Sequence, residues 1–246
     1  SRKQEKREDA VAFQSDSLQC SKKMRGWGNL PPLFFRQVTY PMITDVTGVL
    51  LGGGKSRRMG EDKRFILVGQ ETLFDRSLTV LREVFEAVSV VIAQDSPPLQ
   101  ADVPVVRDLI PDCGSLGGLY TGLRLAETQH IFVVACDMPF LNPDVIRHMV
   151  QLKDSADIVI SRWATCLQPT HAVYGRNCLP VIEEMMTLHN RKIHSMVSHP
   201  ALRVCVVPEV EIRQIDPDGR SMFNLNTPSD VEQARSVCGP GTGIGS

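Results

Sequence analysis

Short apolar runs alternate with amphipathic segments along most of the chain. From Thr44 onward, runs rich in Val, Ile and Leu are separated by segments whose apolar positions follow a helical period. This alternation is typical of βαβ units and of a mainly parallel sheet. The runs that predict strands span 46–51, 88–93, 103–106, 131–135, 157–160, 170–174 and 202–207. We therefore expect an α/β fold, a Rossmann-like sheet between two layers of helices.

The predicted helices have recognisable beginnings. Asn142-Pro143-Asp144 and Thr227-Pro228-Ser229-Asp230 each place a capping side chain before proline and an acidic residue in the first turn, which favours helix initiation. The first of these opens a helix at Asn142, and the second opens a helix that we expect to end near Val237. Helical spacing or a small-residue start predicts the other helices at 72–85, 115–128, 176–188 and 190–197.

The two ends of the chain differ in composition from the centre. Ser1–Arg25 has seven Lys or Arg residues against four Asp or Glu and few apolar residues, which predicts poor order. A partner-binding arm and a dispensable extension are both compatible with residues 1–41, and we favour the extension. Residues 239–246 are glycine-rich and predict a flexible tail. Because 42–238 contains no repeat and no linker, we expect it to form one domain.

Charge and cysteine usage exclude several classes of protein. The 246 residues carry a formal net charge of −1, with 42% hydrophobic and 22% charged residues, which argues against a dedicated nucleic-acid binder. No apolar run reaches the length of a membrane span and the N-terminus has no signal-like apolar core, so we expect a cytoplasmic protein without a membrane partner. The seven cysteines contain no C-x-x-C pair, which favours free thiols over zinc ligation or a disulfide framework.

A glycine run with four nearby cations follows the first predicted strand. Glycine leaves backbone N–H groups accessible to an anion, and basic side chains add donors for phosphate oxygens. The loop therefore predicts phosphate binding, although an ordinary charged loop is the simpler alternative. Its spacing fits neither the Walker A loop nor the dinucleotide motif G-x-G-x-x-G. The loop consists of Gly52, Gly53 and Gly54, followed by the cations Lys55, Arg57, Arg58 and Lys63.

A carboxylate follows the most apolar strand of the chain. Asp137 comes directly after the run 131–135 and Cys136, and Pro139 then ends the strand. Ligands of parallel sheets bind at the carboxyl ends of the strands, and a hard oxygen there suits Mg²⁺ that shares its shell with substrate phosphates. An aspartate that only caps a turn is the alternative, but beside a phosphate loop we favour metal binding.

Three weaker candidates share that predicted edge. Asp108 follows the strand 103–106. There it could accept hydrogen bonds from a ribose or a base, or simply form an ion pair with Arg107. The run Gly114–Gly118 would let a ligand approach a helix start closely. Asn224 and Asn226 precede the last helix, where asparagine is also a common turn residue. His171 lies inside a predicted strand, so we interpret it as structural rather than catalytic.

Four of these segments resemble motifs of the molybdenum cofactor guanylyltransferase family, a branch of the GT-A-like nucleotidyltransferases. Residues 51–63 are similar to L-A-G-G-x-S-x-R-M-G-x-D-K if Gly52 replaces the alanine and Lys55 occupies an extra position. The other three, in the family's order, are 114–118 for G-P-L-A-G, 136–139 for C-D-x-P and 224–228 for N-x-N-T-P. The chain departs from G-P-L-A-G at Ser115 and Gly117, and 1–41 has no counterpart in the family core.

The resemblance implies an activity and a role for each site residue. It implies transfer of GMP from GTP to the terminal phosphate of molybdenum-molybdopterin, with release of pyrophosphate and with Mg²⁺ as cofactor. By this resemblance Lys63 contacts the α-phosphate, Arg58 the triphosphate, and Asp137 the metal, with Asn226 and Asn224 in its outer shell or on the substrate. The implied nucleoside contacts are Leu51, Gly52, Gly53 and Asp108.

The same reasoning leaves other functions open. A related nucleotidyltransferase could use CTP on molybdopterin, or a nucleoside triphosphate on a sugar phosphate. A silent nucleotide-binding scaffold is a third hypothesis, which the presence of both Lys63 and Asp137 disfavours. The region 165–200, with Gln168, Thr170, Arg191 and Lys192, is a candidate for pterin contacts. Cofactor-delivery or acceptor proteins are candidate partners, and the pattern does not specify an oligomeric state.

Overall fold

The computed structural model describes residues 40–52 and 62–238. The chain divides into two units at the Tyr40–Pro41 bond, and the second unit, Pro41–Ser246, contains the fold. The predicted boundaries at 41 and 239 fall next to residues outside the described ranges, so the domain limits stay a prediction. Gly53 and Arg58, two of the predicted site residues, also lie outside the described residues.

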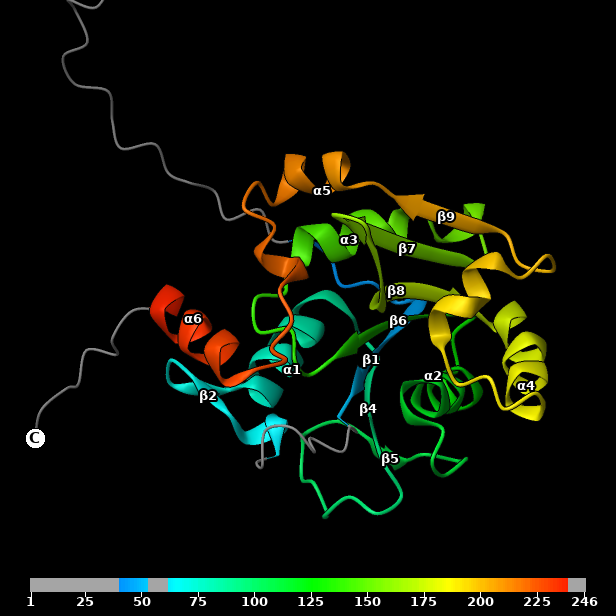
Figure 1. The fold of residues 1–246 in the computed structure, drawn as a ribbon, viewed down its shortest axis with the longest axis horizontal. Helices are drawn as coiled ribbons and strands as arrows, with labels where there is room; N and C mark the ends of the chain where they lie inside the picture. The colour runs from blue at the N-terminus through cyan, green and yellow to red at the C-terminus, as the bar shows by residue number, and fades with distance from the viewer. Residues whose placement is uncertain (1–39, 53–61, 239–246) are drawn as a thin grey trace, which may run out of the picture. The chain divides into compact units, whose positions relative to one another are not determined.

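A seven-stranded sheet forms the centre of the unit (Figure 1). Its strand order is β5-β4-β1-β6-β8-β7-β9. Neighbours pair in parallel from β5 through β6 and again between β7 and β9, whereas β8 runs antiparallel to both of its neighbours. The strands are β1 Val46–Leu51, β4 Val88–Ile92, β5 Val105–Arg107, β6 His130–Ala135, β7 Ile158–Trp163, β8 Cys166–Gly175 and β9 Val204–Val207.

The central strand β1 is buried at every residue, which explains its continuous apolar run: a strand covered on both faces shows no alternation. Its register pairs Leu51 with Val91 of β4 and with Ala135 of β6. Gly48 in this strand is needed for packing, because a Cβ there would come within 2.8 Å of the Phe85 ring. The pairing brings the carboxyl ends of β1, β4 and β6 to one edge of the sheet.

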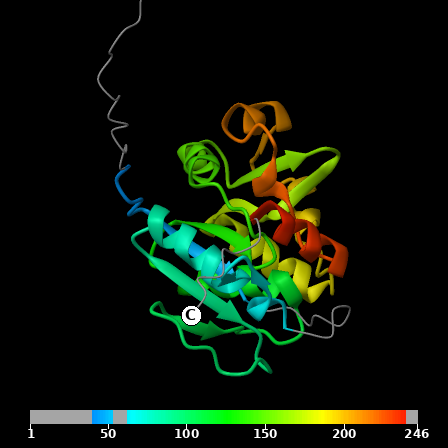
Figure 2. The same cartoon turned by 90° about the vertical axis from the view of Figure 1, so that its left-hand side faces the viewer.

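Helices cover both faces of the sheet (Figures 1 and 2). One face packs against α1, α3 and α5 around Phe74, Ile146 and Ile212, and the other against α2 and α4 around Leu119 and Ile182. The predicted three-layer, mainly parallel α/β architecture is thereby confirmed. The helices are α1 Leu73–Val84, α2 Gly114–Leu125, α3 Pro143–Gln151, α4 Leu179–Thr187, α5 Glu209–Ile215 and α6 Pro228–Cys238.

A small hairpin and the last helix form a third apolar cluster. Strands β2 Leu67–Val68 and β3 Glu71–Thr72 pair antiparallel beside α6, and Val68, Leu225 and Ala234 pack together. The expected caps of α3 and α6 are present, since Asn142 accepts from the N–H of Asp144 and Thr227 accepts from that of Asp230. Five short 3₁₀ segments complete the described part: η1 Lys63–Phe65, η2 Lys153–Ser155, η3 Arg176–Cys178, η4 Ile193–Ser198 and η5 Arg220–Met222.

One helix prediction was wrong, and one helix was not predicted. Residues 190–197 do not form an α-helix but the 3₁₀ segment η4, in which Ile193 and Met196 are buried three residues apart, the spacing of a 3₁₀ turn. The helix α5, Glu209–Ile215, was missed because its pattern has a single fully buried apolar residue, Ile212. It begins after Pro208, which accepts from the N–H groups of Glu211 and Ile212.

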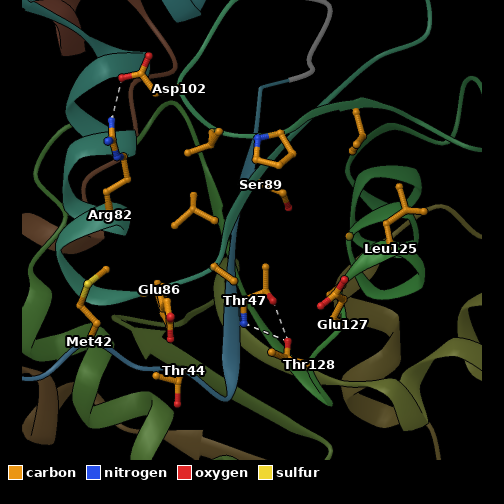
Figure 3. A pocket seen from close by; sticks show the side chains of 18 residues that line it. Met42, Thr44, Thr47, Arg82, Glu86, Ser89, Asp102, Leu125, Glu127 and Thr128 are labelled. Carbon is orange, nitrogen blue, oxygen red and sulfur yellow. Dashed lines mark hydrogen bonds and ion pairs between the residues drawn. The ribbon is translucent and has the colours of Figure 1, made fainter.

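A cavity of about 790 Å³ lies at the opposite edge of the sheet (Figure 3). It is lined by residues at the starts of β1 and β4, including Thr47 and Ser89, and by Leu125 and Thr128 at the end of α2. None of the predicted site residues in the described part of the chain lines it. Separately, no helix among the described residues has both the length and the apolar character needed to span a lipid bilayer.

Candidate active site

The predicted site residues gather where parallel strands end. Leu51 ends β1 and Gly52 follows it, Asp108 follows β5, and Asp137 comes two residues after β6. Gly52 donates its N–H to the carbonyl of Val91 at 2.9 Å, and Cys136 donates to that of Leu51 at 3.3 Å. These backbone bonds extend the pairing of the strands past their ends. The edge is therefore a rigid platform for the side chains above it.

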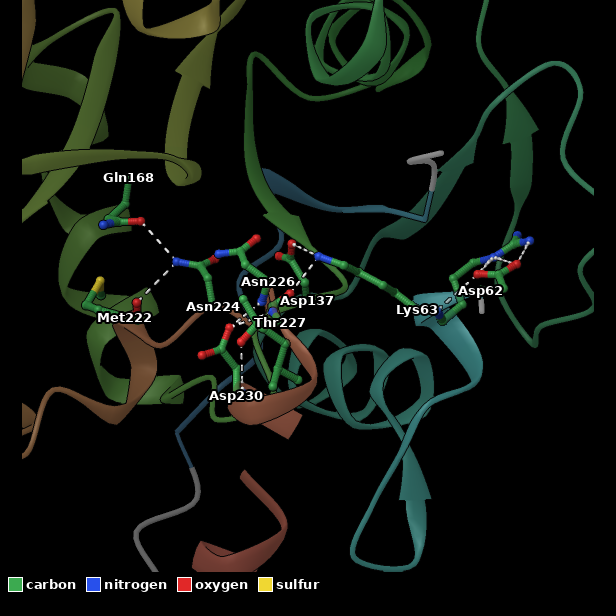
Figure 4. A network of polar contacts seen from close by, with 11 residues as sticks. Asp62, Lys63, Asp137, Gln168, Met222, Asn224, Asn226, Thr227 and Asp230 are labelled. Carbon is green, nitrogen blue, oxygen red and sulfur yellow. Dashed lines mark hydrogen bonds and ion pairs between the residues drawn. The ribbon is translucent and has the colours of Figure 1, made fainter. Parts of the chain in front are cut away.

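Lys63 and Asp137 meet at this edge (Figure 4). The ammonium Nζ of Lys63 lies 3.5 Å from Oδ2 of Asp137 and donates to the carbonyl oxygen of Leu225 at 2.6 Å. The N–H of Leu225 in turn donates to the carbonyl of Asp137 at 2.9 Å. A cation, a carboxylate and the segment before α6 thus form one connected group, although they lie 74 and 162 residues apart in the chain.

The Asp137 carboxylate has the properties of a single protein ligand for a metal. Burial raises its pKa, and the positive charge and hydrogen bond of Lys63 oppose that rise. About 24% of the side chain remains exposed, so the carboxylate is open to a ligand. Among the described residues, no three His, Cys, Asp or Glu side chains lie together as a metal site. A partly exposed carboxylate of this kind is suited to a hard divalent cation that takes the rest of its shell from water and substrate phosphates.

Asp108 is a buried carboxylate without a full set of partners. Its residue is 8% exposed, and Oδ1 has no hydrogen-bond partner among the described residues. Desolvation raises its pKa from the ordinary 3.8 to about 6, and a hydrogen bond from Thr121 opposes the rise. A buried carboxylate with an unpaired oxygen is suited to accept a hydrogen bond from a ligand that carries N–H or O–H groups.

The start of α2 is close-packed around Asp108. A Cβ on Gly117 would lie 3.1 Å from the carbonyl oxygen of Ile110 and 3.6 Å from Oδ2 of Asp108. A Cβ on Gly118 would lie 2.9 Å from Cδ2 of Leu51. Glycine at both positions lets the helix start approach the end of β1, and Gly117, where the family motif has alanine, avoids the Ile110 carbonyl.

Asn224 and Asn226 lie on either side of Leu225, whose carbonyl accepts the hydrogen bond from Lys63. Asn224 Nδ2 donates to Oε1 of Gln168 at 3.3 Å and to the carbonyl of Met222 at 3.2 Å. The N–H of Asn226 donates to Asp230 at 2.8 Å, and Figure 4 shows its side chain beside Asp137. Asn226 is therefore placed near the predicted metal ligand, whereas Asn224 faces Gln168.

His171 is a core residue, in line with its structural interpretation. It is fully buried in β8, with its ring edge-on to Phe132 at 5.1 Å between centroids. Burial lowers its pKa to about 4, so the ring is neutral near pH 7.

Three residues near the site were not anticipated. Asp62 caps η1, the segment that carries Lys63, and forms an ion pair with the buried Arg64. Gln94 follows β4 and donates its side-chain amide to the carbonyl of Asp108. The D-K pair of the motif contained a signal for Asp62, because aspartate before a short helical turn is a common N-cap. The sequence contained no comparable signal for Gln94 or for the burial of Arg64.

Comparison with protein families gives the class of this protein. The model of the MobA-like NTP transferase domain matches residues 48–204, well over half of the chain. The protein is a nucleotidyltransferase, and it belongs to the MobA-like NTP transferase family.

Curated relatives narrow the family. The chain is similar to a probable molybdenum cofactor guanylyltransferase of Pelotomaculum thermopropionicum, at 39% identity over 78% of this chain and 93% of the relative. It is 35% identical to the molybdenum cofactor guanylyltransferase of Syntrophotalea carbinolica, over 80% of this chain and 94% of the relative. The chain therefore belongs to the molybdenum cofactor guanylyltransferase family.

Solved structures agree with this assignment. The molybdopterin-guanine dinucleotide biosynthesis protein A of Archaeoglobus fulgidus superposes with a TM-score of 0.69 at 25% identity, over 78% of this chain and 98% of that one. Rv0371c from Mycobacterium tuberculosis, solved as a complex with manganese, shares the fold with a TM-score of 0.57 at 18% identity, over 78% of this chain and 98% of that one.

Proposed function

We propose that this enzyme transfers GMP from GTP to the terminal phosphate of molybdenum-molybdopterin, forming the guanine dinucleotide cofactor and pyrophosphate. The observation that carries the proposal is the Lys63–Asp137 pair at the carboxyl edge of the sheet, in a chain whose relatives are named molybdenum cofactor guanylyltransferases. A cation beside a carboxylate is what phosphoryl chemistry needs, because positioning and charge neutralisation account for most of its catalysis.

The reaction as proposed needs no general base. The second pKa of a phosphate monoester is near 6, so the acceptor phosphate is already a nucleophilic anion at neutral pH. The neutral, core-packed His171 is consistent with this chemistry, because it takes no part in the site. Lys63 is the proposed group that neutralises charge developing on the α-phosphate oxygens.

Asp137 is the proposed ligand of a divalent cation, and Mg²⁺ is the ion we propose. Its hard, partly exposed carboxylate supports this assignment, as does the manganese complex of a protein with the same fold. When bound, the ion supplies positive charge that compensates the charge of the phosphates. Asn226, which lies beside Asp137, is proposed as an outer-shell group, and Asn224 as a substrate contact.

The nucleoside is proposed to lie over the ends of β1 and β5. Leu51 and Gly52 lie at the end of the central strand, and Asp108 offers a carboxylate oxygen that lacks a partner among the described residues. A base or ribose that brings N–H or O–H donors would satisfy it, and guanine has such donors. Gly53 and Arg58 are proposed to contact the nucleoside and the triphosphate, respectively.

Three further parts of the hypothesis stay proposals. Pterin contacts are placed in 165–200, where Gln168 lies next to Asn224. We propose a cofactor-delivery or acceptor protein as the macromolecular partner. We propose neither a nucleic acid nor a membrane as a partner. The cytoplasm is the proposed compartment.

Binding of nucleotides tests the base preference directly. Thermal unfolding is measured with GTP, CTP or ATP, each with Mg²⁺. A ligand at 100 times its Kd stabilises by about 2.7 kcal/mol, which for a chain of this size raises Tm by roughly 5–10 °C. We expect that rise with GTP and a much smaller one with CTP and ATP. A rise with CTP and none with GTP would show that the enzyme is a cytidylyltransferase instead.

A further inference from the structure

Two charged residues that form an ion pair flank Lys63 in the sequence. Asp62 and Arg64 lie on either side of the lysine, and their side chains meet in a two-pronged contact. Arg64 Nε lies 3.0 Å from both carboxylate oxygens of Asp62, and its Nη2 lies 2.5 Å from Oδ2. The N–H of Arg64 also donates to Asp62 Oδ1 at 3.1 Å, which makes Asp62 the N-cap of η1. The loop that carries Lys63 is therefore closed by both backbone and side-chain bonds.

Arg64 anchors this closed loop to the sheet. Its side chain is only 4% exposed, whereas that of Asp62 is 37% exposed. A Cβ on Gly52 would lie 3.7 Å from Cδ of Arg64, so the arginine stem packs beside the end of β1. The guanidinium also lies 5.3 Å from the centroid of the Phe65 ring. Burial of a charge is unfavourable unless the charge is paired, and here the pairing carboxylate comes from the cap of the same turn.

Lys63 extends away from this pair. Figure 4 shows its side chain leaving η1 on the side opposite Asp62 and reaching Asp137. A lysine side chain loses considerable rotamer entropy when it is held in one geometry, so a fixed backbone reduces the number of torsions that must be ordered. Among the described residues, the Lys63 side chain bonds to Leu225 and Asp137. The pair is thus linked to Lys63 through the backbone of η1 and not by a side-chain hydrogen bond.

We propose that the Asp62–Arg64 pair is a positioning device for Lys63: it fixes the backbone of η1 so that the ammonium reaches the reacting phosphate. Arg64 is thus a positioning residue that does not touch substrate. The proposal rests on the role assigned to Lys63 under the proposed function. The competing account is direct contact, because Arg64 Nη1 is buried and has no partner among the described residues, so it could donate to the nucleotide.

A double-mutant cycle separates the two accounts. Single-turnover formation of product from GTP is measured for the wild type, Arg64→Met, Lys63→Met and the double variant, together with the Kd for GTP from titration. Arg203→Met is the matched control. Arg203 makes the same two-pronged contact with Asp157, at 3.2 and 3.1 Å, and also bonds that carboxylate through its N–H. Its pair lies before β7 and β9, away from the carboxyl edge that carries Lys63.

Positioning through Lys63 predicts a specific pattern of rates. Misplacement of a catalytic group by about 1 Å can lower a rate by up to about 100-fold, so we expect Arg64→Met to slow turnover by about 10-fold or more. In the Lys63→Met background the same substitution should change the rate by less than about twofold, because groups that act as one unit are not additive. The Kd for GTP should change little, Arg64→Lys should recover only part of the rate, and Arg203→Met should leave the rate intact.

Several results would overturn the proposal. Equal losses for Arg64→Met with and without Lys63, or a weakened Kd for GTP in the Lys63→Met background, would show direct contact with the nucleotide. An equal loss of rate for Arg203→Met would show that the effect of Arg64→Met arises from general destabilisation of the protein. Failure of the proposed function is a different result: either the wild type forms no product from GTP, or Lys63→Met reacts at the wild-type rate, and each of these overturns both proposals.

Discussion

Substitution of Asp108 by asparagine is expected to stabilise the protein and weaken its nucleotide binding. Asparagine has nearly the same shape but carries no charge at any pH. The pKa of Asp108 is raised from 3.8 to about 6 by burial, and the residue is only 8% exposed. One pKa unit corresponds to 1.36 kcal/mol, so the ionised carboxylate destabilises the folded state by about 3 kcal/mol above pH 6.

The pH window follows from the direction of this shift. The folded state holds the proton of Asp108 more tightly than the unfolded state does, so the folded state is favoured when the group is protonated. The destabilisation is absent below about pH 4, develops between pH 4 and 6, and is complete above pH 6. We expect Asp108→Asn to lie about 0–2 kcal/mol below the wild type near pH 4 and to exceed it at pH 8 by about 1–3 kcal/mol, because the buried amide lacks full hydrogen bonding at every pH.

Urea unfolding at several pH values between 4 and 8 measures this difference. Asp157→Asn is the matched control, because Arg203 lowers the pKa of Asp157 and the same change should destabilise the protein at pH 8. GTP titration should show binding about 10-fold weaker in Asp108→Asn, the loss of one charge-assisted hydrogen bond. A stability difference from the wild type that does not vary with pH would refute the reasoning.

Three other changes test separate parts of the structure. Asp137→Asn should abolish metal-dependent turnover while GTP still shifts Tm, and unchanged product formation would remove Asp137 from the mechanism. Gly219→Ala should destabilise by about 3 kcal/mol or more, because φ is +65° and a Cβ would lie 1.9 Å from the Trp163 ring; urea unfolding checks this, and a loss below about 1 kcal/mol would contradict it. A chain that begins at Met42 should fold and turn over normally, and insolubility of that chain would place residues 1–41 within the fold.

Local patterns accounted for the sheet and for the position of Asp137. The buried run of β1 and the capped starts of α3 and α6 are short-range features, and each could be predicted from a few neighbouring residues. The end of β6 placed Asp137 at the carboxyl edge because parallel strands end together. The position of Asp137 directly after a strand was therefore enough to predict that it lies at the ligand-binding edge of the sheet.

The contacts that complete the site could not be predicted in this way. The hydrogen bond from Lys63 to Leu225 joins residues 162 positions apart, and its acceptor is a backbone carbonyl, which every residue has. Arg64 lies in a basic stretch, and no sequence signal marks it for burial, because its burial depends on packing beside Gly52. Helix α5 had too few apolar positions for a periodic pattern.

The hydrogen bond to Leu225 also has a consequence for how the enzyme is made. All strands of the main sheet have been synthesised once the ribosome passes Val207 at the end of β9, and the family match ends at residue 204. The carbonyl that holds Lys63 appears only later, with the segment before α6. A nascent or prematurely terminated chain that stops between these points has every strand of the sheet, but its Lys63 has Asp137 without the Leu225 carbonyl. Under the role proposed for Lys63, competence for catalysis is among the last properties that the growing chain acquires.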